Sequence, residues 1–307
     1  MNAGPAAAMA CPGCASPVAG GDRFCEECGR DLRADPPVPA PACVACGAAG
    51  IDADGYCETC GQHQPRGRDH LESDLGAAAG VTDKGRVRHR NEDALALAAA
   101  GGGLVAVVCD GVASTERSDE ASAAATGAAA AVLAEALRAG GDLEDATRAA
   151  VAAAHAAVLA LPGPFTPNSG PACTYVSAVV TGGGITTGWL GDSRAYWLGD
   201  DGDSARLTTD DAVGHALTRW IGAEAGDVDP HVATVVPAGP GTVLACTDGL
   251  WNYLPDPAAL AALAAPAGGP LAAARALTRA ALEAGGADNV TVAMLRYPPE
   301  PSEREAP

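Results

Sequence analysis

The chain has 307 residues, with 19 Lys and Arg against 38 Asp and Glu, so its formal net charge is −19. This charge argues against general binding to nucleic acid or anionic membranes, because both need a basic surface. About 48% of the residues are hydrophobic, which is enough for a sizeable core. No apolar run is long enough to span a membrane and no secretory signal is present, so we expect a soluble, cytoplasmic protein without a membrane partner.

Eight of the eleven cysteines lie in the first 60 residues, as CxxC pairs in two copies of one repeat. Four thiolates arranged as a tetrahedron satisfy a structural zinc ion. Disulfides are the alternative, which the lack of a secretory signal disfavours. We therefore predict two small zinc ribbons, at residues 10–30 and 42–62, each folded around one Zn ion. Their ligands would be Cys11, Cys14, Cys25 and Cys28 in the first and Cys43, Cys46, Cys57 and Cys60 in the second.

The ribbon segment has more acidic than basic residues. A protein partner is therefore expected for the ribbons, and nucleic acid is not. Composition predicts a double zinc ribbon at 1–65, a linker at 66–75, a large domain at 76–298 and a disordered tail at 299–307.

From residue 76 onward, strand patterns alternate with pairs of helix patterns. Apolar runs around a glycine turn predict a hairpin at 93–109. Ala-rich segments with acidic first turns predict two helices, one from Ser118 and one from Asp142 to Leu161. Because strands come in groups and helices in pairs, this order predicts an α+β fold with antiparallel sheets covered by helices. The other expected elements are strands at 173–180, 185–191, 193–199, 205–208, 242–246 and 289–297 and helices at 256–265 and 270–286.

Acidic residues stand where several of these strands begin or end. Asp110, Asp192 and Asp248 each follow an apolar strand, and Asp288 precedes the last one. A single DG or DN is most simply a turn. Several carboxylates at the rim of the sheets, however, are what hard cations such as Mg²⁺ or Mn²⁺ need. Together with Glu92, three of them (Asp110, Asp248 and Asp288) carry four negative charges, which would balance two divalent ions.

These motifs, taken in order, resemble the metal-dependent protein serine/threonine phosphatases of type 2C. The resemblance covers roughly residues 76–297 and rests on VTDKGRVRHRNEDA, VVCDG, CTYVSAVV, GWLGDSRAY, CTDGLWN and GGADNVTV. It implies two antiparallel β-sheets packed as a sandwich and flanked by helix pairs. It also implies hydrolysis of phosphoserine and phosphothreonine on proteins by a water that two Mn or Mg ions activate. The implied partners are phosphorylated proteins, and the enzyme would oppose a serine/threonine kinase in signal transduction.

The resemblance assigns a metal centre to the acidic residues of these motifs. Asp110 would bridge the two ions, and Asp110 and Asp248 would be catalytically essential. Asp192 belongs to a third metal position in bacterial members; here its partner position holds Asn252, so a third ion should bind weakly or be absent. The implied metal-site residues are Glu92, Asp93, Asp110, Gly111, Asp192, Asp248 and Asp288, with Asp93 supporting the ligands from behind.

Three arginines alternate in GRVRHRNED, next to the acidic pair. The resemblance places Arg88 at the catalytic, phosphate-binding position, where its guanidinium fork would hold two phosphate oxygens. Arg86 and Arg90 are expected as solvated or surface-paired side chains. Some members carry a His two residues after the bridging Asp. Val112 stands there in this chain, so water would protonate the leaving oxygen.

A second function is compatible with the same sequence. The zinc ribbons could make the chain a signalling adaptor, with a phosphatase-like domain that reads phosphoproteins but turns over little. The four carboxylates and Arg88 are all retained, however, which favours the enzyme.

Overall fold

The computed structural model describes residues 67–299 apart from 167–168, 215 and 227. Nearer the N-terminus it describes 9–11, 14, 16–18, 27, 48–51 and 57–61. The chain divides into two compact units, Met1–Gln64 and Pro65–Pro307. The first unit contains the predicted zinc ribbons and the second contains every predicted phosphatase motif.

In the first unit the chain turns back at both described CxxC pairs. β1 (Met9–Ala10) pairs antiparallel with β2 (Pro17–Val18), and the amide of Cys11 donates to the carbonyl of Ser16. The amide of Gly61 donates to the carbonyl of Cys57. Such turns are typical of metal knuckles. Of the predicted zinc ligands, Cys11, Cys14, Cys57 and Cys60 are described, whereas Cys25, Cys28, Cys43 and Cys46 lie outside the described residues.

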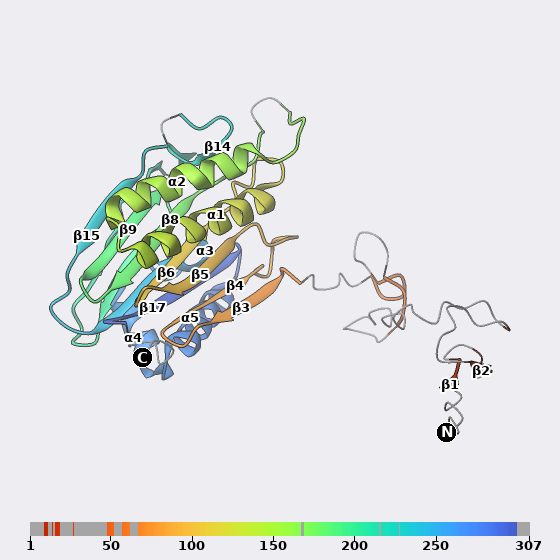
Figure 1. Cartoon of the computed structure of the whole chain (residues 1–307). Coiled ribbons are helices and arrows are strands. Elements are labelled where there is room, and N and C mark those ends of the chain that lie inside the picture. Colours follow the sequence, from red (N-terminus) through yellow and green to blue (C-terminus); the bar gives the residue numbers. More distant parts are fainter. Residues whose placement is uncertain are drawn as a thin grey trace, which may run out of the picture. The chain divides into compact units, whose positions relative to one another are not determined.

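The second unit consists of four layers (Figure 1). Helices α1 (Ser118–Ala139) and α2 (Leu143–Leu159) cover one face, and α4 (Pro257–Ala264) and α5 (Pro270–Ala284) cover the other. Two antiparallel sheets lie between them, which confirms the predicted α-β-β-α sandwich. The five-stranded sheet has the order β15 (His231–Val235), β9 (Gly184–Leu190), β8 (Tyr175–Thr181), β6 (Gly103–Cys109) and β5 (Ala94–Ala100). The six-stranded sheet has the order β11 (Ser204–Arg206), β10 (Arg194–Gly199), β16 (Gly241–Cys246), β17 (Val290–Tyr297), β4 (Ala78–Asp83) and β3 (His70–Asp74).

Strand β6 shows why this chain folds into layers. All seven of its residues are buried. Because side chains alternate across a sheet, Val105 and Val107 pack against α1 and α2, whereas Ala106 and Val108 pack against the other sheet. A third apolar layer joins the six-stranded sheet to α4 and α5. The near-continuous apolar run in the sequence is thus a strand covered on both faces.

The helix boundaries follow the local signals. Asp142 caps α2 by accepting a hydrogen bond from the amide of Asp145, and Asp256 caps α4 in the same way from Ala258. Helix α1 ends at Gly140, whose φ of 64° is left-handed. Among the described residues, no helix combines the length and apolar character that a membrane crossing requires.

The structure differs from the sequence-based prediction in the segment predicted as a linker, residues 66–75. Residues 70–74 of this segment form β3, which pairs along β4 from His70↔Asp83 to Asp74↔Ala79. Its sequence, HLESD, is mostly polar. Polar residues are tolerated there because β3 is an edge strand whose side chains are mostly exposed. Strand β15 was also absent from the sequence-based expectations, since its side chains are only partly buried and alternate weakly.

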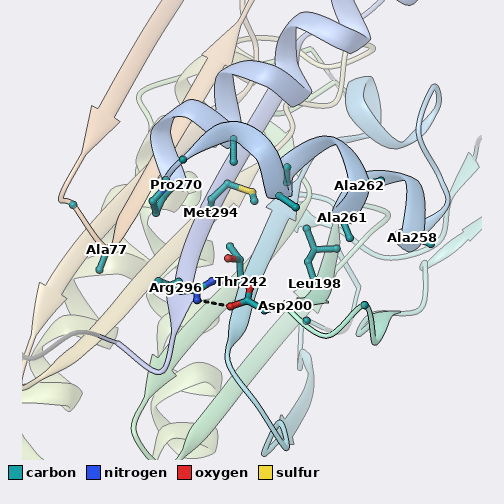
Figure 2. Close-up of a pocket in the computed structure, with 18 residues that line it drawn as sticks. Ala77, Leu198, Asp200, Thr242, Ala258, Ala261, Ala262, Pro270, Met294 and Arg296 are labelled. Carbon is teal, nitrogen blue, oxygen red and sulfur yellow. Dashed lines mark hydrogen bonds and ion pairs between the residues drawn. The ribbon is translucent and has the colours of Figure 1, made fainter.

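A cavity of about 870 Å³ lies between α4, α5 and the six-stranded sheet. Alanine and glycine dominate its lining, since the short side chains of these helices leave space above Met294 and Leu198 (Figure 2). Asp200 and Arg296 are the two charged side chains of the lining, and they pair with each other at 2.5 Å. The predicted metal-site residues lie elsewhere.

Two glycine substitutions should change stability in opposite directions. Gly127 lies exposed within α1 with open space around its Cα, so Gly127→Ala should raise the free energy of unfolding by about 0.5–1 kcal/mol. Gly101 has a φ of 54°, and an added Cβ would lie 2.3 Å from the carbonyl oxygen of Leu137. Gly101→Ala should therefore lower the free energy of unfolding. Thermal unfolding followed by tryptophan fluorescence measures both, and shifts of the same sign would contradict this description.

Candidate active site

A second cavity, of about 130 Å³, lies at the rim of the sandwich where strands of both sheets begin or end. Asp110 follows β6 and Asp192 follows β9, whereas Asp248 follows β16 and Asp288 precedes β17. The structure thus brings together carboxylates that are far apart in the sequence. The cavity is lined by Arg88, Glu92, Asp110, Gly111, Asp192, Asp248 and Asp288, together with Val112, Ala113, Thr174, Leu217 and Asn289.

Backbone hydrogen bonds beyond the end of β6 hold Asp110. Its amide donates to Thr174 Oγ1 at 3.0 Å, and its carbonyl accepts from the amide of Thr174 at 2.8 Å. Gly111 then passes so close to its neighbours that an added Cβ would lie 2.7 Å from the carbonyl oxygen of Glu92. Only glycine fits there without a backbone shift.

Asn289 fixes the segment that carries Arg88. Its side-chain oxygen accepts from the amide of Glu92 at 2.8 Å. Its side-chain nitrogen donates to the carbonyls of Lys84 at 2.7 Å and Arg90 at 2.9 Å. One buried amide therefore holds both ends of the loop around Arg88 against β17.

Asp93 is the one predicted metal-site residue that does not line the cavity. It is buried, and its Oδ2 accepts from Thr247 Oγ1 at 2.8 Å and from Thr291 Oγ1 at 2.7 Å. Burial raises the pKa of Asp93 to about 7, although these two hydrogen bonds favour the charged form. Asp93 thus lies behind the carboxylates that line the cavity. Its position does not support direct contact with a metal ion.

The carboxylates strongly affect one another. Burial, which is the largest cause, and the charges of Asp288 and Asp192 together raise the pKa of Asp248 to about 6. Burial also raises the pKa of Asp110 well above its usual range, with Asp93 and Asp248 adding to the effect. Several carboxylates in one small cavity thus repel one another, and a bound cation would relieve that repulsion.

Two arginines already contact this acidic cluster. Arg88 Nη2 lies 2.6 Å from Asp288 Oδ2, and Arg90 Nη2 lies 2.8 Å from Glu92 Oε1. Ser118 Oγ also donates to Glu92, at 2.5 Å. Among the described residues, no three acidic, histidine or cysteine side chains are gathered tightly enough to coordinate an ion, and Asp288 and Glu92 are each paired with an arginine. Arg90 is thus surface-paired, as predicted.

Asp192 is positioned from the side by an aromatic residue. Trp251 Nε1 donates to the carbonyl of Asp192 at 2.9 Å. The indole ring of Trp251 lies against the guanidinium of Arg194, with 3.6 Å between the ring centroid and Cζ. Asp210 in turn accepts two hydrogen bonds from Arg194, at 2.7 and 3.0 Å. This stack holds the turn that carries Asp192.

Asn252, at the predicted third-metal position, is turned toward a carboxylate. Its Nδ2 donates to Asp248 Oδ2 at 3.1 Å, four residues earlier, across the short helix α3 (Asp248–Trp251). Asn252 does not line the cavity. Weak binding of a third ion remains a prediction.

Several residues that support the site were not singled out from the sequence. Asn289 and Thr247 adjoin predicted ligands, so the DN and TDG motifs carried a signal for them. Ser118, Thr174 and Trp251 carried none, because each acts on a residue from a different motif.

The rim of a mixed α+β sandwich thus holds a cluster of carboxylates, with Arg88 in the lining of the same cavity. The sequence pattern of the protein phosphatase 2C family matches residues 84–284, which is more than half of the chain. The chain therefore belongs to the protein phosphatase 2C family. The pattern of the double zinc ribbon matches residues 11–61. Curated proteins yielded no match.

Several solved structures of bacterial serine/threonine phosphatases share this fold. The Ser-Thr phosphatase MsPP from Mycobacterium smegmatis, in complex with cacodylate, is 29% identical, with a TM-score of 0.56 over 73% of this chain and 99% of that one. The catalytic domain of PstP with two manganese ions is 25% identical, with a TM-score of 0.60 over 74% and 99%. Stp1 from Staphylococcus aureus, 22% identical with a TM-score of 0.61 over 75% and 98%, shares the fold.

In metal-free protein, Asp248→Asn should stabilise the second unit near neutral pH. The folded-state pKa of Asp248, about 6, exceeds its ordinary 3.8, so its ionisation costs stability as pH rises from about 4 and the full cost is present above about 6. The variant removes this cost. We expect its melting temperature to exceed that of the wild type by several degrees near pH 7.5, and the gain to shrink toward pH 4.

Tryptophan fluorescence suits this measurement, because all four tryptophans lie in the second unit. Asp203→Asn, in the exposed loop between β10 and β11, is the control. A gain that is equal at both pH values would contradict the assigned cause.

Proposed function

We propose that the chain hydrolyses phosphoserine and phosphothreonine on proteins with a water activated by two Mn or Mg ions held in the carboxylate cavity. The observation that carries this proposal is the convergence of Arg88, Asp110, Asp248 and Asp288 on one opening. A phosphate group needs a cationic fork, and two divalent ions need several carboxylates at the same place.

The donor set supports divalent ions. Every predicted ligand offers oxygen, which hard cations prefer. Asp248 Oδ1 is buried without a hydrogen-bond partner, as suits an oxygen that binds a cation. PstP, a structure with the same fold, is a complex with two manganese ions. We propose that Asp110, Glu92, the Gly111 carbonyl, Asp248 and Asp288 would hold these ions.

When bound, the two ions would supply an activated water for displacement of the serine or threonine oxygen from phosphorus. Arg88 binds two phosphate oxygens through its guanidinium fork, and Asp288 orients that fork by its 2.6 Å contact. Asp93, held by Thr247 and Thr291, backs the ligands with a further buried carboxyl. Val112 lines the cavity where a side-chain acid would otherwise stand, so solvent protonates the leaving oxygen.

The N-terminal unit has a separate proposed role. Its match to the double zinc ribbon and the burial of Cys11 and Cys57 support two structural zinc sites, in ribbons at 10–30 and 42–62. Four thiolates close a zinc site to substrate. We therefore propose that this unit docks a protein partner or substrate, and that the phosphatase domain opposes a serine/threonine kinase.

Manganese-dependent hydrolysis of a phosphothreonine peptide tests the catalytic proposal. Asp248→Asn should lower kcat by about a hundredfold or more, because it removes a ligand charge. Arg88→Ala should lower kcat/KM by roughly ten- to a hundredfold through lost phosphate contacts. Arg86→Ala is the matched control, since Arg86 is an exposed arginine outside the cavity lining. Equal rates for wild type and Asp248→Asn would remove the metal assignment, and phosphopeptide binding without turnover would favour the adaptor.

Elemental analysis of the purified chain tests the ribbons. We expect two zinc ions per chain, and one after Cys11 and Cys14 are both replaced by serine, because each ribbon binds its ion independently. Phosphatase activity on a short peptide should not change in that variant. A zinc content near zero in the wild type would refute the ribbon assignment.

A further inference from the structure

A short hairpin borders the carboxylate cavity. β12 (Ala212–Val213) pairs with β13 (Ala216–Leu217), and Leu217 lines the cavity with Asp192. Each strand has two residues, and Val213 is 76% exposed, so the hairpin buries little apolar surface of its own. Its position must come from contacts at its base.

Asp211 makes those contacts on the side of the cavity. Its amide donates to the carbonyl of Gly191 at 2.9 Å, and its Oδ2 accepts from the amide of Gly191 at 3.2 Å. Its carbonyl accepts from the amide of Thr218, just after the hairpin, at 2.8 Å. One residue therefore ties both ends of the hairpin to the turn that carries Asp192.

The other carboxylate oxygen of Asp211 faces the five-stranded sheet. Oδ1 lies 2.9 Å from His231 Nε2, at the start of β15, and the His231 ring stacks on Trp189 with centroids 5.0 Å apart. Arg219 Nη1 is 2.9 Å from His231 Nε2 and 4.0 Å from Asp211 Oδ2. The Asp211 side chain is only 11% exposed, whereas its partner His231 is 43% exposed.

We propose that Asp211 is a positioning residue for this phosphatase. Its carboxylate links Gly191 and His231 at the same time, and so sets where the hairpin and Leu217 lie beside the cavity. A carboxylate has two accepting oxygens, whereas an asparagine would turn a donor toward one of the two partners. Asp211 does not line the cavity. Any effect of Asp211 on catalysis therefore passes through Leu217, and this part of the proposal rests on the proposed function. The effect of Asp211 on the position of the hairpin is independent of the proposed function.

Limited trypsin digestion tests the positioning without any catalytic readout. Cleavage after Arg219, at the base of the hairpin, requires this segment to detach. In Asp211→Asn and Asp211→Ala we expect that cleavage to accelerate about tenfold, with melting temperatures within about 3 °C of the wild type, because the lost contacts are local. The control is Asp229→Asn: this side chain is 64% exposed and pairs with Arg148 on α2. A cleavage rate within twofold of the wild type in both Asp211 variants would overturn the proposal.

Kinetics test the consequence for substrate. A phosphothreonine peptide must pass the hairpin, whereas p-nitrophenyl phosphate needs only the cavity. In Asp211→Asn we expect kcat/KM for the peptide to fall by about tenfold and that for the small ester to stay within about twofold. Equal losses for both would overturn the proposal and place the effect in the metal site. If the wild type hydrolyses neither substrate, the proposed function fails, and the digestion still decides the role of Asp211.

Discussion

Mutual repulsion of carboxylates at one end of the sandwich is the constraint on which the rest of this molecule depends. Burial and like charge both raise the pKa values of Asp110 and Asp248, so the bare cluster is unfavourable at neutral pH. Natural proteins retain such clusters where bound cations offset the unfavourable electrostatic free energy of the carboxylates. Instability of the isolated cluster and the proposed affinity for divalent ions would thus have one physical origin.

The folded chain keeps these carboxylates together because several independent contacts hold the backbone on both sides of them. Asn289 and Thr174 hold the backbone on which the ligands stand. Close approach of the main chains adds to this, since a Cβ on Gly249 would lie 1.9 Å from the carbonyl oxygen of Asn289. Rigid support of this kind keeps charged groups together that would otherwise separate.

The segment after Asp110 supports the site through the loop before α1. This loop is secured by Glu116, which accepts hydrogen bonds from Thr166 and Ser169, and by Arg117, which pairs with Glu120 and has a left-handed φ of 55°. The backbone at this strained residue leads directly into Ser118, which donates to Glu92. This loop therefore helps to hold the Glu92 carboxylate in place.

By itself, the sequence determined the elements whose signals are local: the helices begun by Asp142 and Asp256, the apolar strands apart from β4, the repeated CxxC pairs, and the acidic residues at strand ends. It did not determine β3, whose polar residues form a strand only because β4 offers a partner. Nor did it determine that Arg88 meets Asp288, 200 residues away, or that Trp251 supports Asp192. Periodicity and capping act over a few residues and can be read along the chain, whereas contacts between motifs exist only once the two sheets have packed.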